Sequence, residues 1–287
     1  MVQFSINRLG STFGFGDDFT EELVGQYYVY SVDNDVVIVE VNVDPIENYV
    51  VKLNGTELVE GVDFTTEQTS KNGEWSKRTY VINKELFAEE GEYSIIVSST
   101  DKAESTAYSD VKNLTVAFVV DQTAPVITIS GLANEGRYQT DEQTVSLIPS
   151  DEGGRLNSLK VVVMDADGNP LINEETGENI SLRFEMNGEE LLAYLDENGG
   201  KITFTVPSGY NLQVQVICND CAINANGETN EYNEIFTKVT VSQSQLVIFY
   251  ANKPAFYGTI AGSVALLAVI ILLLKRKKNK KKANSLT

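Results

Sequence analysis

GEYSIIVSSTDKA, residues 91–103, decides the fold of this chain, because a second copy of its pattern stands further along. The apolar residues of this stretch alternate with polar ones, a period that is typical of a β-strand with one face in a core. The second copy is SGYNLQVQVICNDCA, residues 208–222. Asp101 of the first copy falls on Asp220 of the second, and Ala103 falls on Ala222. Each copy therefore predicts a strand that runs into a polar loop.

The same alternation recurs through most of the chain, with turn residues between the runs. Its other examples are Val37/Val39/Val41/Val43, Leu114/Val116/Phe118/Val120, Val145/Leu147, Leu159/Val161/Val163 and Ile202/Phe204/Val206. The strongest helical signal is 187–200, where Asn187 is the expected cap, Glu190 its capping-box partner and Gly199 the end. Repeats of roughly 100 residues built from short strands indicate Ig-like sandwiches. We therefore predict an all-β fold of two tandem Ig-like β-sandwich domains, followed by one transmembrane α-helix.

The predicted membrane helix is AFYGTIAGSVALLAVIILLL, residues 255–274, which contains no charged side chain. A helix of this length spans roughly 30 Å, the thickness of a bilayer's hydrocarbon core. Gly258 and Gly262 form a GxxxG pattern, which indicates a candidate helix–helix contact without fixing the oligomeric state. The lipid bilayer is thus the first expected partner, bound through residues 255–274.

A basic tail follows this helix and predicts its orientation. Its cations are Lys275, Arg276, Lys277, Lys278, Lys280, Lys281 and Lys282. The positive-inside rule places such a tail in the cytoplasm and the preceding chain outside the cell. The whole chain has 22 Lys and Arg against 41 Asp and Glu, and every acid precedes Lys253. So acidic a surface repels nucleic acid, which excludes nucleic-acid binding as a function.

The predicted organisation has six parts. Residues 1–27 are the end of a preceding module or a lead-in strand, 28–122 the first Ig-like domain, 123–245 the second, 246–254 a juxtamembrane linker, 255–274 the transmembrane helix and 275–287 the cytoplasmic tail. The first 30 residues contain no secretory signal pattern, and FSINR (4–8) is similar to FVVDQ (118–122). We therefore expect the chain to be the membrane-proximal end of a longer array of modules.

The stretch YSIIVSSTDKA, followed by a further strand and VDQTAP, resembles the bacterial Ig-like modules of Gram-positive, Clostridia-type cell-surface proteins. In that family the strand often ends in a TDxAGN loop, whereas here Glu104 and Ser105 stand in place of Gly-Asn. Asn252-Lys253-Pro254, a single span and a Lys-rich end are also similar to the family's C-terminal layout. The resemblance implies a single-pass protein of the cell membrane, adhesin-like or a stalk.

Catalysis is not expected, because the chain contains no histidine and therefore no Ser–His–Asp triad, Cys–His pair or His metal site. No P-loop or Rossmann glycine pattern follows a strand, so no cofactor is predicted. Two functions remain: a non-catalytic stalk or adhesion scaffold that presents more distal domains, or Ig-like modules that themselves bind a carbohydrate or protein outside the cell.

Cys218 and Cys221 are the two cysteines of the chain and form one CxxC. A zinc site would need two further ligands, and the chain has no other Cys or His to supply them. A local disulfide that pins the loop and a pair of reduced thiols both remain open, since the outcome depends on the redox compartment.

Calcium is the metal to consider in an acidic β-protein, and four aspartates are weak candidates for it. Asp165 and Asp167 begin a calcium-loop spacing, but Pro170 and Thr176 stand where an EF-hand needs Gly and Glu. A hairpin turn explains the same residues. Asp101 and Asp220 lie at equivalent loop entries, where an aspartate side chain commonly accepts hydrogen bonds from the nearby backbone. The sequence DEGG (151–154) likewise predicts a turn. No metal site is therefore predicted, with calcium between modules as the alternative.

Overall fold

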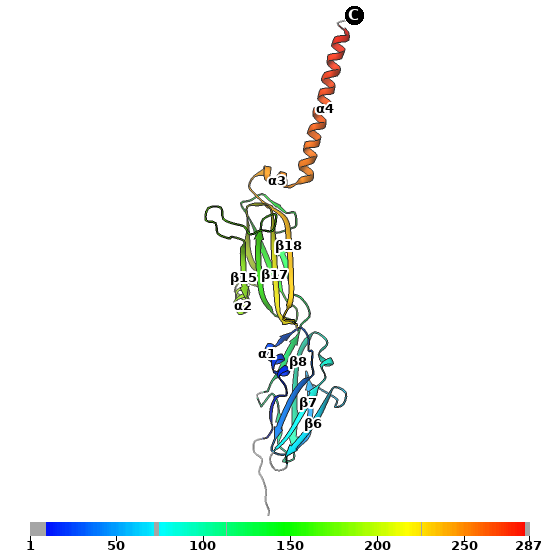
Figure 1. The fold of residues 1–287 in the computed structure, drawn as a ribbon, viewed down its shortest axis with the longest axis vertical. Coiled ribbons are helices and arrows are strands. Elements are labelled where there is room, and N and C mark those ends of the chain that lie inside the picture. Colours follow the sequence, from blue (N-terminus) through cyan, green and yellow to red (C-terminus); the bar gives the residue numbers. More distant parts are fainter. Residues whose placement is uncertain (1–9, 72–74, 113, 225, 285–287) are drawn as a thin grey trace, which may run out of the picture.

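The computed structural model describes residues 10–284 except 72–74, 113 and 225, with side chains described as far as residue 277. Its elements in chain order are β1 (Thr12–Phe15), α1 (Asp18–Gln26), β2 (Tyr28–Val29), β3 (Val36–Asn42), β4 (Ile46–Leu53), β5 (Thr56–Glu57), β6 (Phe64–Lys71), β7 (Trp75–Ile82), the 3-10 helix η1 (Lys84–Phe87), β8 (Gly91–Asp101), β9 (Thr106–Tyr108), β10 (Val116–Val120), β11 (Val126–Ser130), β12 (Arg137–Tyr138), β13 (Glu142–Ser150), β14 (Leu156–Met164), β15 (Leu182–Asn187), α2 (Gly188–Glu197), β16 (Ile202–Pro207), β17 (Gly209–Ile223), β18 (Thr229–Val241), α3 (Gln245–Ala251) and α4 (Lys253–Asn284). The strands form two Ig-like sandwiches that stand end to end, with α4 beyond the second (Figure 1). The predicted all-β fold with one C-terminal apolar helix is confirmed.

The first sandwich, residues 10–120 and here called the first module, packs two sheets around one core. One sheet has the order β1-β3-β7-β6, and the other contains β2-β10-β8-β4-β5 with β9 paired to β8. Strand β1 and helix α1 belong to this module, since Leu23 is buried in its core and Phe13, Phe15 and Phe19 pack against it. The module thus begins ahead of the predicted boundary at residue 28.

The core-facing row of β3 differs from the one that the valine alternation predicted. Val36 and Ile38 are fully buried, whereas Val41 and Val43 are exposed. The inward row continues into Glu40 and then Asn42, which are buried polar residues. The predicted row is the outward face of β3, and its valines made that face look like the core-facing one. The row with Glu40 points inward because Tyr80 donates to the Glu40 carboxylate over 2.5 Å and Ser99 also donates to it.

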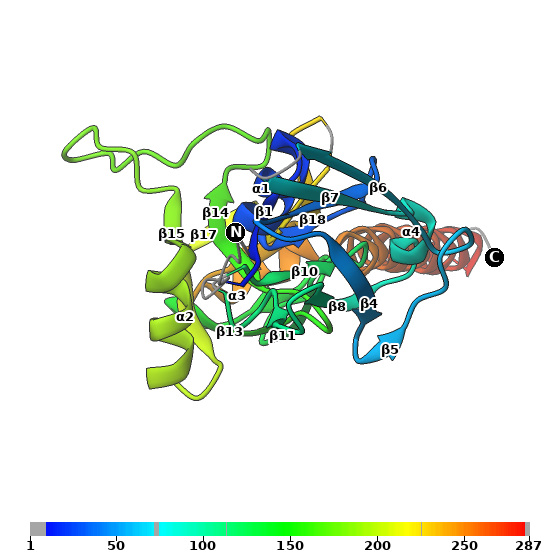
Figure 2. The ribbon, with the colours of Figure 1, turned by 90° about the horizontal axis from the view of Figure 1, so that it is seen from below.

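The second sandwich, residues 126–241 and here called the second module, repeats this plan. A sheet of β11-β13-β16 faces a sheet in which β14 pairs with β15 and β17, and β17 pairs with β18. Every alternating row predicted for β13, β14, β16 and β17 is buried in its core. Helix α2 confirms the helix predicted at 187–200 and buries Leu191 and Leu195, but Asn187 makes no capping hydrogen bond with its side chain. Helix α2 and the segment between β14 and β15 project from the side of the module (Figure 2).

Strand β2 joins the two modules into one continuous sheet. It pairs in parallel with β10 of the first module, with Val119 opposite Tyr28 and Val120 opposite Val29. It also pairs with β17 of the second module, where Ile223 lies opposite Val29. The resulting path runs β12-β18-β17-β2-β10-β8-β4-β5 across the junction. The modules are therefore connected by backbone pairing as well as by the chain itself.

A short helix, α3, connects the second module to α4 in place of the predicted linker at 246–254. Residues 253–277 belong to one helix that is apolar and long enough to cross a membrane, and its apolar 18-residue window has a mean hydropathy of 2.4. The Lys253 ammonium lies 3.2 Å from the centroid of the Tyr250 ring, and that ring packs 5.5 Å from the ring of Tyr210 in β17. This aromatic contact fixes the base of α4 against the second module.

Candidate functional site

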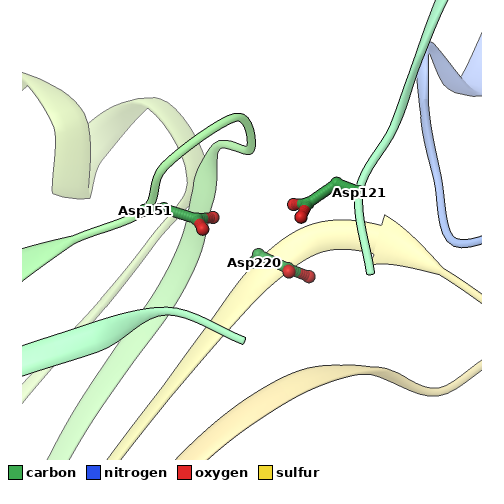
Figure 3. Close-up of side chains that lie close together, drawn as sticks. All are labelled: Asp121, Asp151 and Asp220. Atoms are coloured by element: carbon green, nitrogen blue, oxygen red, sulfur yellow. The ribbon is translucent and has the colours of Figure 1, made fainter. Parts of the chain in front are cut away.

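Three aspartates meet where the first module passes into the second. Asp121 directly follows β10, Asp151 directly follows β13, and Asp220 lies near the end of β17. One carboxylate oxygen from each lies within 4.8 Å of the others, and the side chains converge in Figure 3. Asp121 comes from the last strand of the first module and the other two come from the second. The cluster therefore bridges the junction.

Local hydrogen bonds hold two of these side chains in place. Asp220 accepts from the backbone N–H of Ala222 over 3.0 Å through Oδ1, and from Asn230 Nδ2 over 2.7 Å through Oδ2. Asp121 accepts from the backbone N–H of Thr123 over 3.1 Å through Oδ1. The Asn230 amide also donates to the Asp121 carbonyl over 3.2 Å. Asn230 thus ties the two modules together at this point.

The remaining oxygens of the cluster are buried and find no hydrogen-bond partner among the residues that the structure describes. They are Asp121 Oδ2 and both carboxylate oxygens of Asp151. Asp121 is only 2% exposed, and its carboxylate points toward the other two side chains (Figure 3). Residue 154 has to be glycine here, because a Cβ would lie 1.9 Å from Asp121 Oδ2 and 2.6 Å from Asp151 Oδ2. The chain thus packs tightly around oxygens that it leaves unsatisfied.

Ionisation of this cluster is costly in the absence of a cation. Burial, and then the neighbouring Asp121, raise the pKa of Asp151 to about 6. Burial raises the pKa of Asp220 to about 7, and burial also raises the pKa of Asp121. Glu90 adds further negative charge nearby, and among the described residues no Lys or Arg forms an ion pair with the three aspartates. Such a site either retains protons or binds a positive ion.

The first module has an equivalent position with different chemistry. The first residue pair of β1 and β3 is Thr12–Val41, and that of β11 and β13 is Val126–Ser150, so Asn42 corresponds to Asp151. The Asn42 amide donates to Asp101 Oδ2 over 3.0 Å and to Ser11 Oγ over 3.0 Å. An amide and a carboxylate therefore meet in the first module where two carboxylates meet in the second.

Of the four aspartates that the sequence singled out as weak calcium candidates, only Asp220 lies in this cluster. Asp101 accepts from the backbone N–H groups of Ala103 and Ser105, as its loop-entry position predicted. Asp165 accepts from the N–H groups of Asp167 and Asn169 and closes the expected hairpin turn. Asp167 is exposed at that turn.

Sequence reasoning missed Asp121 and Asp151. Asp121 stands in the DQTAP linker, and Asp151 opens DEGG, which we had interpreted as a turn. The signal that could have found Asp151 is the repeat. Asp151 is the equivalent of Asn42, and Asp220 is the equivalent of Asp101, to which Asn42 is hydrogen-bonded.

The CxxC cysteines are both free thiols in the structure. They lie three positions apart on β17, so strand alternation turns them to opposite faces. Cys218 is fully buried in the core, whereas Cys221 is partly exposed. The candidate disulfide is therefore not formed, since joining these thiols would require β17 to leave its extended conformation.

The remaining sequence signals lie on α4. Lys275, Arg276 and Lys277 are exposed, whereas the side chains of Lys278, Lys280, Lys281 and Lys282 lie outside the described part of the chain. FSINR (4–8) lies outside it as well. A Cβ at Gly258 or Gly262 would meet no atom within 4 Å, so the face that carries the GxxxG pattern is open.

Comparisons with known proteins identify no family for this chain. No protein-family model and no curated protein sequence matches it. Among solved structures, the N-terminal eight Ig domains of Down Syndrome Cell Adhesion Molecule isoform 1.30.30 align with 72% of this chain and 22% of that chain, at 11% identity and a TM-score of 0.21. BcpA, the major pilin subunit of Bacillus cereus, aligns with 73% of this chain and 64% of that chain, at 11% identity and a TM-score of 0.15. The Ig-like assignment therefore rests on the sheets and cores described above.

Proposed function

We propose that this chain is a non-catalytic, membrane-anchored protein of the cell surface, in which the two modules form a stiff stalk. The observation that carries this proposal is the pairing of β2 with both β10 and β17. A flexible linker lets neighbouring domains reorient, whereas a strand shared by two sheets opposes that motion. The module resemblance described above supports a bacterial, adhesin-like surface protein of the Clostridia type.

Backbone hydrogen bonds on both sides of β2 support the stiffness of the junction. Val119 N–H donates to the Tyr27 carbonyl over 2.7 Å, and Asp121 N–H donates to the Val29 carbonyl over 3.0 Å. On the other side, Tyr30 N–H donates to the Ile223 carbonyl over 3.3 Å. Bending at the junction would break these bonds in a partly buried region, which costs free energy.

The orientation that we propose places both modules outside the cell and residues 275–287 in the cytoplasm. The exposed cations Lys275, Arg276 and Lys277 at the end of the apolar helix support this direction by the positive-inside rule. At the other end, Tyr250, Phe256 and Tyr257 form a chain of ring contacts, as expected of an aromatic belt at a membrane surface.

Orientation is tested by labelling intact cells that express the chain with a membrane-impermeant amine reagent. Lys102 and Lys201, both exposed, serve as reporters for the two modules, and Lys275 and Lys277 report on the tail. We expect labelling of the module lysines alone in intact cells, and of all four after permeabilisation. Labelling of the tail with protection of the modules would contradict the proposal.

Stiffness is tested on the full chain in lipid nanodiscs, with a donor dye at the N-terminus and acceptor dyes on the lipid. We expect weak energy transfer in the native chain, because the modules hold the donor away from the bilayer. Tyr30→Pro removes one N–H donor to Ile223 and should raise and broaden the transfer, while Tyr30→Phe keeps the N–H and serves as control. Strong transfer that is equal in all three chains would refute a stiff stalk.

Specific binding of the modules to a glycan or host protein would instead favour the ligand-binding alternative.

A further inference from the structure

We propose that Asp121, Asp151 and Asp220 bind one calcium ion at the junction between the modules. This goes beyond the proposed function, because the ion would bind wherever the chain is located. The side chains supply oxygen ligands alone, which suits a hard divalent cation. Since Asp121 belongs to the exit of the first module and the other two belong to the second, the ion would link one module to the next.

Distances within the cluster suit calcium. Calcium binds oxygens at about 2.3–2.6 Å, so two oxygens on opposite sides of one ion lie about 4.6–5.2 Å apart. The three carboxylate oxygens lie within 4.8 Å of one another, a separation that one such ion can span. Magnesium needs near-octahedral oxygens at about 2.0–2.1 Å and usually retains its waters, so a buried set of three carboxylates suits it less well.

Unsatisfied buried oxygens provide the independent argument for a ligand. Asp121 is 2% exposed and its carboxylate points at the other two, yet its Oδ2 accepts no hydrogen bond from any described residue. Both oxygens of Asp151 are also buried without a partner. A buried carboxylate that is neither paired nor hydrogen-bonded is rare, because its desolvation is not offset. One cation between these side chains satisfies all three unpartnered oxygens.

The first module shows that the fold itself does not require three acids at this position. Asn42 stands where Asp151 stands, and its amide satisfies Asp101 by a direct hydrogen bond. The second module has a carboxylate there, which repels Asp220 unless a cation lies between them. The amide of Asn230 satisfies one oxygen of Asp220 and leaves Asp121 Oδ2 and Asp151 to the ion.

The experiment is calorimetric titration of calcium chloride into the full chain in zwitterionic nanodiscs, after removal of metal with EDTA. We expect saturable binding of one ion per chain, with a Kd on the order of 10⁻⁴–10⁻³ M, the range of extracellular modules. Asp121→Asn and Asp151→Asn should each weaken it at least roughly tenfold, because ligand charge sets calcium affinity. Asp167→Asn changes an exposed aspartate of the second module and should leave the affinity unaltered.

A second readout separates metal binding from a structural role of the acids. In a Cys221→Ser background, protection of the buried Cys218 thiol from a maleimide reports on folding of the second module. In EDTA, Asp151→Asn should protect Cys218 at least as well as the native chain does, because the first module already has an asparagine, Asn42, at the equivalent position. In calcium, Cys218 should be better protected in the native chain than in Asp151→Asn. No saturable calcium binding up to about 10 mM, well above that range, would overturn the proposal. Native calcium affinity in both Asn variants, or magnesium binding as tight as calcium binding, would also overturn it.

Discussion

The side-chain amide of Asn42 donates a hydrogen bond to Asp101 Oδ2 over 3.0 Å, at the buried polar end of the first module. At the matching end of the second module, Asp151 faces Asp220, and both positions carry carboxylates. At this end the two modules share a backbone arrangement, and the first has the neutral Asn42 where the second has Asp151. This difference makes the first module an internal reference for the electrostatics of the second.

Asn42→Asp should destabilise the first module. The substitution removes an amide donor and places a second carboxylate beside the buried Asp101, so we expect a loss of about 1–3 kcal/mol in the free energy of unfolding at pH 7 in EDTA. Trp75, the sole tryptophan, lies in β7, so its fluorescence during urea unfolding reports on this module alone. Asn48→Asp, at an exposed position, is the control and should change stability little. A variant as stable as the native chain would show that the Asn42 amide is not needed.

Tyr80→Phe should also destabilise the first module. Tyr80 is fully buried and donates to Glu40 over 2.5 Å, so its loss leaves a buried carboxylate oxygen with one donor fewer. We expect the free energy of unfolding to fall by about 1–3 kcal/mol, measured by Trp75 fluorescence. Tyr108→Phe removes an exposed phenol and should shift stability by less than about 0.5 kcal/mol. Equal effects of the two substitutions would contradict the role given to the Glu40 contact.

The two thiols should react at very different rates. Native chain treated with a maleimide should gain one label, at the partly exposed Cys221, and a second only when urea opens the core around Cys218. Mass spectrometry counts the labels directly. Cys221→Ser should gain none before unfolding and one after it. If the thiols resist labelling in urea and react only after a reductant is added, they form a disulfide, which would contradict the structure.

Leu267→Arg should impair membrane anchoring. Leu267 lies near the middle of the apolar part of α4, where an arginine costs about 2.5–3.5 kcal/mol on the insertion scale. Carbonate extraction of membranes from expressing cells measures the effect, and a larger fraction of the variant should appear in the soluble fraction. Leu267→Ala retains an uncharged helix and should stay with the membrane. Extraction of the native chain by carbonate alone would contradict anchoring by this helix.

Much of the fold could be predicted from the sequence, because alternation marks a strand whose two faces differ. The rows along β14 and β17 are apolar on one face only, and both were identified correctly. In β3 both faces carry valine, so the pattern pointed to the wrong face. What places Glu40 inside is the hydroxyl groups of Tyr80 and Ser99, which come from other strands. Such partners cannot be read from local spacing.

The candidate site was harder to predict for a similar reason. Asp121, Asp151 and Asp220 are far apart in the chain, and each has an ordinary local explanation as a linker, turn or loop-entry residue. The three meet only where the first module passes into the second, and no short motif in the sequence indicates that tertiary contact. The repeat gave the position of Asp220 but not the identity of its neighbours.

Strand β2 has a consequence for crowded surfaces. A sheet that ends in an unpaired strand offers its backbone to any similar strand nearby, and identical chains held at high density in one membrane are the nearest candidates. Because β2 lies against β10, that strand has a neighbour on each side, β2 and β8. The backbone groups of β10 are therefore already paired and are not open to strand exchange with a neighbouring chain.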